Sequence, residues 1–218
     1  ILFVVLIGLD VVFRDTTGAA GISTLAVLPF SDLSENRNYG YFADGMQEEL
    51  LARLARLEEI SVLSRTSVER FRDTVLTIPV IARSLNAGGI IEGSVRVDGN
   101  QLRITVQLID GEADRHLWAE TYEAELTVEN VFAIQERVAD SIAEALRVEY
   151  RRQQSEALGL PTGDIEAYNL YLLGRYHTFR QTPEDLEQAV DYLRQATGRD
   201  RKSTRLNSSH SSVSRMPS

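Results

Sequence analysis

The stretch IIEGSVRVDGNQLRITVQLID, residues 90–110, decides the fold. In its second half apolar and polar residues alternate: Leu102, Arg103, Ile104, Thr105, Val106, Gln107 and Leu108. A period of two predicts a β-strand with one buried and one wet face. The tripeptide Asp98-Gly99-Asn100 divides the stretch and favours a tight turn. The sequence therefore predicts a β-hairpin that has one face packed on a core and the other face exposed to water.

The segments that follow extend this hairpin. A second turn is expected at Asp110–Asp114 and a third strand around Leu117–Tyr122, which would complete an antiparallel meander. Beyond it, apolar residues recur at helical spacing: Val131, Ile134, Val138, Ile142 and Leu146. This stripe predicts a long amphipathic helix packed on the meander.

The segments before the hairpin alternate between strand and helix. Thr24–Phe30 and Ile60–Ser64 favour short buried strands, and Ile78–Leu85 favours a helix with Pro79 in its first turn. Asp44 with Gln47 matches a capping pair. One face of the helix that would follow is apolar: Met46, Leu50, Leu54 and Leu57.

This order of elements predicts the fold class and the main domain. Strand, helix, strand, helix, meander and helix describe an α/β (α+β) domain over residues 23–150, with a small mixed sheet and antiparallel meander packed by helices. Residues 151–164 have the composition of a linker.

Residues 165–199 carry two helical patterns, which predict an all-α helical repeat hairpin after the α/β domain. Their spacing matches a tetratricopeptide repeat, in which small residues let paired helices approach. The residues of this pattern are the candidate protein-binding residues: Leu170, Leu173, Gly174, His177, Ala189, Leu193 and Ala196. One repeat cannot bury its own face, so further repeats are expected, and the partner would be a protein or peptide.

Composition argues against several classes of site. The net charge is −9, so phosphate-rich nucleic acid is not an expected partner. Arg65, Arg70, Arg72 and Arg83 gather in one region, and pairing with the abundant carboxylates is favoured over binding nucleic acid. Cysteine is absent and the three histidines lack metal-ligand spacing, so neither a metal nor a cofactor site is expected.

The sequence predicts no catalytic residue. The adjacent pair Glu48-Glu49 favours a solvated helix face over acid/base chemistry. Ser94, His116 and Asp110 could be arranged as a triad, but Ser94 lacks the sharp turn that exposes a nucleophile. Trp118 favours packing against the long helix over ligand binding.

The two ends of the chain differ from the middle. Residues 1–13, ILFVVLIGLDVVF, resemble the end of a truncated transmembrane anchor, with a buried strand or a signal-peptide core as alternatives. Residues 14–22 favour a linker. Residues 200–218 can be encoded by DNA that resembles a widely used sequencing adapter, so we expect disordered read-through there.

Several blocks together resemble one family, the TolB-like amino-terminal domain of bacterial membrane-anchored regulators. The blocks are LAVLPFSDLS (25–34), YFADGMQEEL (41–50), IIEGSVRVDGNQLRITVQLID (90–110), HLWAETYE (116–123) and VFAIQERVADSIAEAL (131–146). The helical segment after residue 164 resembles the first tetratricopeptide repeat that usually follows this domain.

The resemblance implies a noncatalytic sensory or protein-docking region. The effector in such proteins usually lies upstream and is an adenylate cyclase, a serine/threonine kinase or a winged-helix transcriptional regulator. The resemblance further implies an inner-membrane anchor with residues 14 onward in the periplasm. The oligomeric state is left open.

Overall fold

The computed structural model describes residues 22–57, 59–146 and 162–213, with side chains up to Lys202. The expected membrane segment 1–13, nearly all of both linkers and the last five residues lie outside these ranges. Among the described helices, none combines the length and the apolar composition needed to cross a bilayer.

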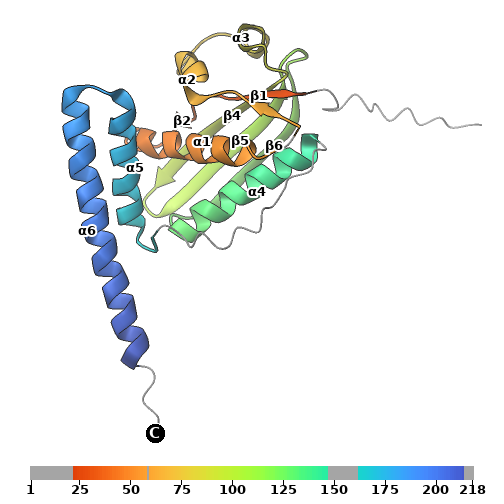
Figure 1. Ribbon diagram of the computed structural model, residues 1–218. Helices are drawn as coiled ribbons and strands as arrows, with labels where there is room; N and C mark the ends of the chain where they lie inside the picture. Colours follow the sequence, from red (N-terminus) through yellow and green to blue (C-terminus); the bar gives the residue numbers. More distant parts are fainter. Residues whose placement is uncertain (1–21, 58, 147–161, 214–218) are drawn as a thin grey trace, which may run out of the picture.

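A mixed sheet forms the centre of the α/β part (Figure 1). Its strands are β1 (Thr24–Val27), β2 (Ser31–Asp32), β3 (Ser61–Val62), β4 (Gly89–Asp98), β5 (Gln101–Asp110) and β6 (Arg115–Glu125). The strand order is β3-β1-β4-β5-β6, and β2 also pairs with β4. Pairs among the first four strands are parallel, whereas β4, β5 and β6 are antiparallel. The predicted small mixed sheet with an antiparallel meander is therefore confirmed.

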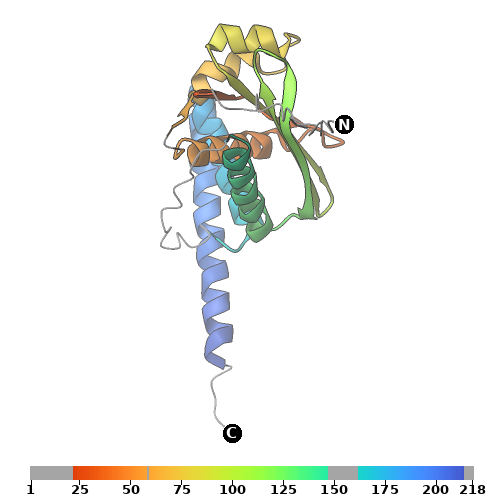
Figure 2. The same cartoon turned by 90° about the vertical axis from the view of Figure 1, so that its right-hand side faces the viewer.

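Some of the helices cover the sheet, and the last two form a hairpin beside it. They are α1 (Gly40–Leu54), α2 (Arg65–Val68), the 3-10 turn η1 (Glu69–Phe71), α3 (Ile78–Leu85), α4 (Val128–Leu146), α5 (Ile165–Arg180) and α6 (Pro183–Val213). Helices α1 and α4 lie on one face of the sheet, and α3 lies near the start of β4 on the other side (Figures 1 and 2). Helices α5 and α6 pack antiparallel beside α1, as the predicted hairpin requires.

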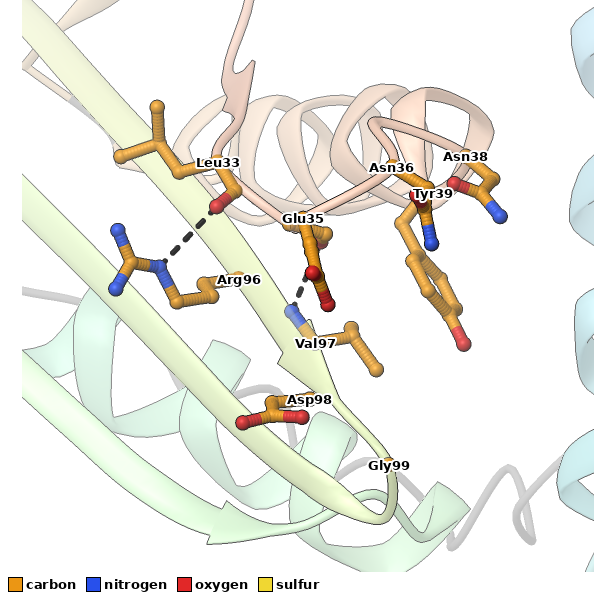
Figure 3. A pocket seen from close by; sticks show the side chains of 10 residues that line it. Leu33, Glu35, Asn36, Asn38, Tyr39, Arg96, Val97, Asp98 and Gly99 are labelled. Carbon is orange, nitrogen blue, oxygen red and sulfur yellow. Dashed lines mark hydrogen bonds between the residues drawn. The ribbon is translucent and has the colours of Figure 1, made fainter.

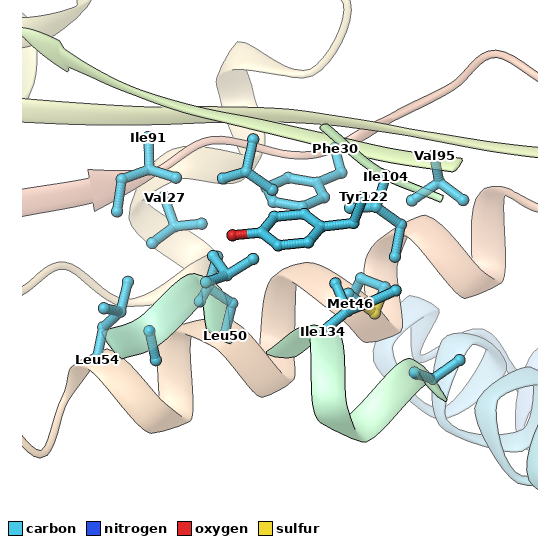
Figure 4. Close-up of a cluster of buried hydrophobic side chains, with 14 of the residues drawn as sticks. Val27, Phe30, Met46, Leu50, Leu54, Ile91, Val95, Ile104, Tyr122 and Ile134 are labelled. Carbon is cyan, nitrogen blue, oxygen red and sulfur yellow. The ribbon is translucent and has the colours of Figure 1, made fainter. Parts of the chain in front are cut away.

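The main core lies between the sheet and helices α1 and α4. The inward residues of β5 are fully buried: Leu102, Ile104, Val106 and Leu108. Figure 4 shows Tyr122 of β6 among side chains from both helices and the sheet. On the opposite face Thr105 bonds Thr121 over 3.0 Å and Arg103 pairs with Glu123 over 2.6 Å. The expected wet face is confirmed.

A break between β1 and β2 positions one aromatic ring. Val27 lies opposite Ile91, but Ser31 lies opposite Ser94, so one extra residue is inserted between the two pairings. The ring of Phe30 fills the space over Gly93, where an added Cβ would lie 2.4 Å from Phe30 Cζ. Gly93 therefore leaves a gap in the core-side row of β4 for this ring.

The expected start of the first helix is wrong. Helix α1 begins at Gly40, one turn before Asp44, so Asp44 and Gln47 lie inside the helix. Both side chains face the interior, and Gln47 Nε2 donates a hydrogen bond of 2.9 Å to the Val27 carbonyl. A capping pattern needs free amide groups, whereas here buried tertiary partners use the same two side chains.

The tail expected to be disordered continues α6 as far as Val213. Residues 199–213 contain neither glycine nor proline. No strong helix breaker therefore interrupts α6 there, although serine, threonine and asparagine are weak helix formers. The interpretation of residues 200–218 as adapter read-through stays a prediction.

Candidate functional site

Several of the candidate protein-binding residues lie between the helices of the α5–α6 hairpin. An added Cβ on Gly174 would lie 2.6 Å from Leu193 Cγ and 3.4 Å from the Ala189 carbonyl oxygen, so the helices approach closely there. Ala189 and Ala196 are buried. The remaining candidates, Leu170, Leu173 and His177, are half-buried. The pattern thus identified residues that hold the two helices together, and their role in binding a partner stays a prediction.

A polar cluster closes the turn between α5 and α6. Asp185 is buried, and its Oδ2 accepts a 2.7 Å bond from the Thr182 hydroxyl while its Oδ1 lies 2.7 Å from Nδ1 of His177. The Asp185 amide bonds back to Thr182, which caps α6. The hydrogen bond from Thr182, followed by that from His177, holds the pKa of Asp185 below its ordinary value.

We expect the hairpin to lose stability in acid through Asp185. Because its pKa is lower in the folded state, its contribution is present above the ordinary value of 3.8 and disappears as the pH falls through the folded pKa. Between pH 5 and pH 3, the free energy of unfolding should therefore fall more in the parent chain than in Asp185→Asn. Urea unfolding at both pH values measures the difference. Equal losses in both chains would contradict the expectation.

Helix α5 docks on α1 through close apolar contact. Gly45 lies against Leu172, whose Cδ2 would be 2.7 Å from an added Cβ. Leu172 and Tyr168 are buried and belong to the main core. The ring of Tyr168 lies 5.7 Å from that of Phe132 on α4. The hairpin is therefore packed against the α/β part as one continuous core.

Replacing Gly45 with leucine should undock α5 without unfolding the sheet. The larger side chain would occupy the position of Leu172, and overpacking of this kind costs about 1–3 kcal/mol. Amide hydrogen exchange should accelerate in α5 and stay slow in β4 and β5. Gly40→Leu provides the control, since an added Cβ there meets nothing within 4 Å. Unchanged exchange in α5 would refute the coupling.

A buried ion cluster lies beside this contact. The Asp44 side chain is only 5% exposed and lies 2.8 Å from Arg65 Nη2 and 2.9 Å from Arg72 Nη1. Arg72 also forms a double hydrogen bond with Glu69. Burial raises the pKa of Asp44, against the opposing effects of Arg72 and Arg65. The sequence expectation that these arginines pair with carboxylates is confirmed for Arg65 and Arg72.

The cluster reaches across to α5. Arg175 pairs with Glu48 and, over 3.3 Å, with Glu49. The Arg65 guanidinium also lies 4.0 Å from the centre of the Phe179 ring, a cation–π contact. The expectation of a solvated face for Glu48 and Glu49 is wrong, because both carboxylates lie in the contact between α1 and α5. The two halves of this cluster lie more than a hundred residues apart in sequence, so no local pattern could have predicted it.

A polar pocket of about 420 Å³ lies at the end of β2 and β4 (Figure 3). Two hydrogen bonds hold its loop: Arg96 Nε donates to the Leu33 carbonyl over 3.1 Å, and the Val97 amide donates to Ser34 Oγ over 2.9 Å. Its other walls come from Glu35, Asn36, Asn38, Tyr39, Asp98 and Gly99. The sequence prediction missed this pocket, because it assigned Asp98 and Gly99 only to a tight turn and said nothing of the loop before Tyr39.

The residues that could form a triad are not brought together. Ser94 lies opposite Thr105 on β5, whereas His116 lies opposite Ile109, which is four residues and roughly 13 Å further along the strand. Asp110 accepts amide hydrogen bonds of the turn after β5. Trp118 is half-buried and packs against the main core. In the described ranges, no group of three or more potential ligands could hold a metal ion.

Fold and site together define a mixed α/β domain with a docked helical hairpin. Residues 21–141 match the family model described as HilA/YgeH-like transcriptional regulator, second domain. The chain belongs to this family.

A curated relative from Rhizobium meliloti (strain 1021), named "Putative adenylate cyclase 3", is 37% identical over 155 residues. The aligned region covers 70% of this chain. The chain spans only 26% of that relative's length.

The solved structures to which this chain shows weak similarity include a lipoprotein, TolB and a domain of LpoB. GNA1162 from Neisseria meningitidis is 17% identical with a TM-score of 0.42, covering 57% of this chain and 99% of its own. TolB from Acinetobacter baumannii is 14% identical with a TM-score of 0.43, and the match covers 59% of this chain and 29% of TolB. The C-terminal domain of LpoB from Salmonella enterica is 18% identical with a TM-score of 0.39, and the match covers 51% of this chain and 88% of that domain. No conclusion about function follows from similarities this weak.

Proposed function

We propose that this chain is a noncatalytic, protein-docking region of a larger bacterial membrane-anchored signalling protein. The observation that carries the proposal is the hairpin itself, which is anchored on α1 yet leaves apolar side chains open on α6. Leu186 and Val190, one turn apart on α6, are 46% and 47% exposed. Such an apolar pair on a rigid helix suits contact with a partner helix or peptide.

We further propose that α5 and α6 up to residue 199 form a first tetratricopeptide repeat behind a TolB-like domain. The close contact of Gly174 with Leu193 and the burial of Ala189 and Ala196 support the helix pairing that such a repeat needs. Further repeats would then cover Leu186 and Val190 or form a groove beside them.

The activity of the larger protein is a second part of the proposal. The name of the relative from Rhizobium meliloti favours an adenylate cyclase, and the description of the family favours a transcriptional regulator. In either protein the effector domain, a cyclase or a winged helix, would lie upstream of this chain. A serine/threonine kinase is the third alternative. Under each of them residues 1–13 would be the inner-membrane anchor and residues 14 onward would be periplasmic.

Site-specific photo-crosslinking tests the docking surface. With a photoreactive amino acid at Val190, we expect one defined partner protein to be captured in cells. Val75 is the matched control, because it is also apolar, is 97% exposed and lies in the loop before α3. The partner should lose affinity at least about tenfold for the double variant Leu186→Glu, Val190→Glu. Equal capture from both positions would refute the docking surface.

An activity assay tests the noncatalytic part. The purified chain with ATP and Mg²⁺ should produce neither cyclic AMP nor inorganic phosphate above the level of a buffer blank. Turnover that scaled with protein concentration would overturn this part of the proposal, whatever the result of crosslinking.

A further inference from the structure

Strand β6 ends the sheet with an open edge. In the ranges that the structure describes, its only strand partner is β5 (Figure 1). The strand is long and contains neither proline nor lysine, two residues that commonly protect edges. Its one irregularity is the register shift near Leu117, so Trp118–Glu125 form a regular edge. An edge of this kind can accept another strand.

The hydrogen-bond phase shows which backbone groups face outward. The Leu126 amide donates to the Asn100 carbonyl over 2.8 Å, so these two residues form a hydrogen-bonded pair between β6 and β5. From Gln101 to Leu108 the register of β5 on β6 continues from this pair without a shift. Hydrogen-bonded pairs alternate along antiparallel strands. The even-numbered residues of β6 therefore bond to β5, while Ala119, Thr121 and Glu123 direct their amide and carbonyl groups to the open edge.

Of the three carboxylates along this edge, those of Glu120 and Glu123 are already paired within the chain. Glu123 pairs with Arg103 over 2.6 Å, and Glu120 pairs with Arg137 over 3.3 Å. A partner strand therefore does not have to bring compensating charge. A self-complementary register in which no carboxylate directly faces another is available instead.

We propose that a second copy of this chain pairs antiparallel with β6 on a two-fold axis at Thr121. In this register Thr121 faces its counterpart and Glu123 faces Ala119, so no like charges are opposed. The hydroxyl pair of Thr105 and Thr121, 3.0 Å apart, would continue across the axis. An axis at Glu120 would oppose two carboxylates, which is unfavourable. The surface is separate from the docking surface on α6.

Sedimentation of the complete 218-residue chain tests the interface. The parent should approach twice its mass of 24.4 kDa as its concentration rises. Thr121→Pro removes an outward amide and breaks no backbone hydrogen bond to β5, although it loses the hydroxyl bond to Thr105; it should raise the dissociation constant at least about tenfold. Thr121→Val, which keeps the amide but loses the hydroxyl, should still dimerise. A monomer at all concentrations, or a dimer unaffected by proline, overturns the proposal.

Cysteine scanning tests the register independently of the proline variant. The chain has no cysteine, so Thr121→Cys can form a disulfide only with a second copy. Directly opposed residues have Cα atoms about 5.5 Å apart, within disulfide range. Cysteine at Glu123 would lie about 13 Å from its counterpart and should not crosslink. Oxidation should link the first variant alone, and linkage of Glu123→Cys in its place would overturn the register.

Discussion

Gly93→Ala is expected to lower the free energy of unfolding by about 3 kcal/mol, which corresponds to a fall in Tm of roughly 10 °C. The added Cβ would lie 2.4 to 2.6 Å from three ring atoms of Phe30. That ring is 3% exposed and is held between the sheet and α1, so it cannot move into solvent without opening the core. Thermal unfolding followed by circular dichroism measures the loss.

Two further variants separate this clash from a general effect of alanine. Phe30→Leu removes the ring atoms nearest to Gly93, so Gly93→Ala should cost less in that background, by at least about 1 kcal/mol. Gly40→Ala is the matched control, because an added Cβ there has nothing within 4 Å. Additive effects of the Phe30 and Gly93 substitutions would show that the ring is not the cause.

Asp44→Ala is expected to cost about 2–3 kcal/mol, because it removes the buried carboxylate shared by two guanidinium groups, which then keep only Glu48 and Glu69 as acidic partners. The side chain of Arg65 is 11% exposed, and it also contacts Phe179 of α5. The variant should therefore destabilise the sheet and accelerate amide exchange in α5 together. Urea unfolding and hydrogen exchange measure the two effects.

The control for Asp44 is an exposed ion pair of similar geometry. Glu123 and Arg103 lie 2.6 Å apart but are 61% and 53% exposed, so Glu123→Gln should change the free energy of unfolding by less than about 1 kcal/mol. A similar small effect for Asp44→Ala would mean that water, and not the two arginines, stabilises this carboxylate.

Local patterns were sufficient for much of the fold. The period of two in residues 101–110 predicted β5 and its wet face, and Asp98-Gly99-Asn100 predicted the turn, which has Gly99 at φ +56°. Proline near the start of Ile78–Leu85 and the stripe from Val131 to Leu146 predicted α3 and α4. These signals act between residues a few positions apart, and tertiary contacts reinforce them.

Patterns that depend on distant partners misled the prediction. Asp44 and Gln47 look like a helix cap, yet one binds arginines and the other binds the Val27 carbonyl. The carboxylates of Glu48 and Glu49 look solvated until α5 brings Arg175 beside them. A carboxylate can cap a helix, join an ion pair or remain hydrated, and the neighbouring sequence favours none of these strongly. The tertiary surroundings of the side chain therefore decide among them.

The sequence by itself therefore determined the fold class and the residues that pair the two helices of the hairpin, because hydrophobic period and small-residue spacing act locally. Only the tertiary structure decided the ion cluster between α1 and α5, the space that Gly93 leaves for Phe30, and the outward phase of Ala119, Thr121 and Glu123. Each of these depends on which distant segment lies alongside, and for the two features of the sheet a one-residue change of strand register would reverse the outcome.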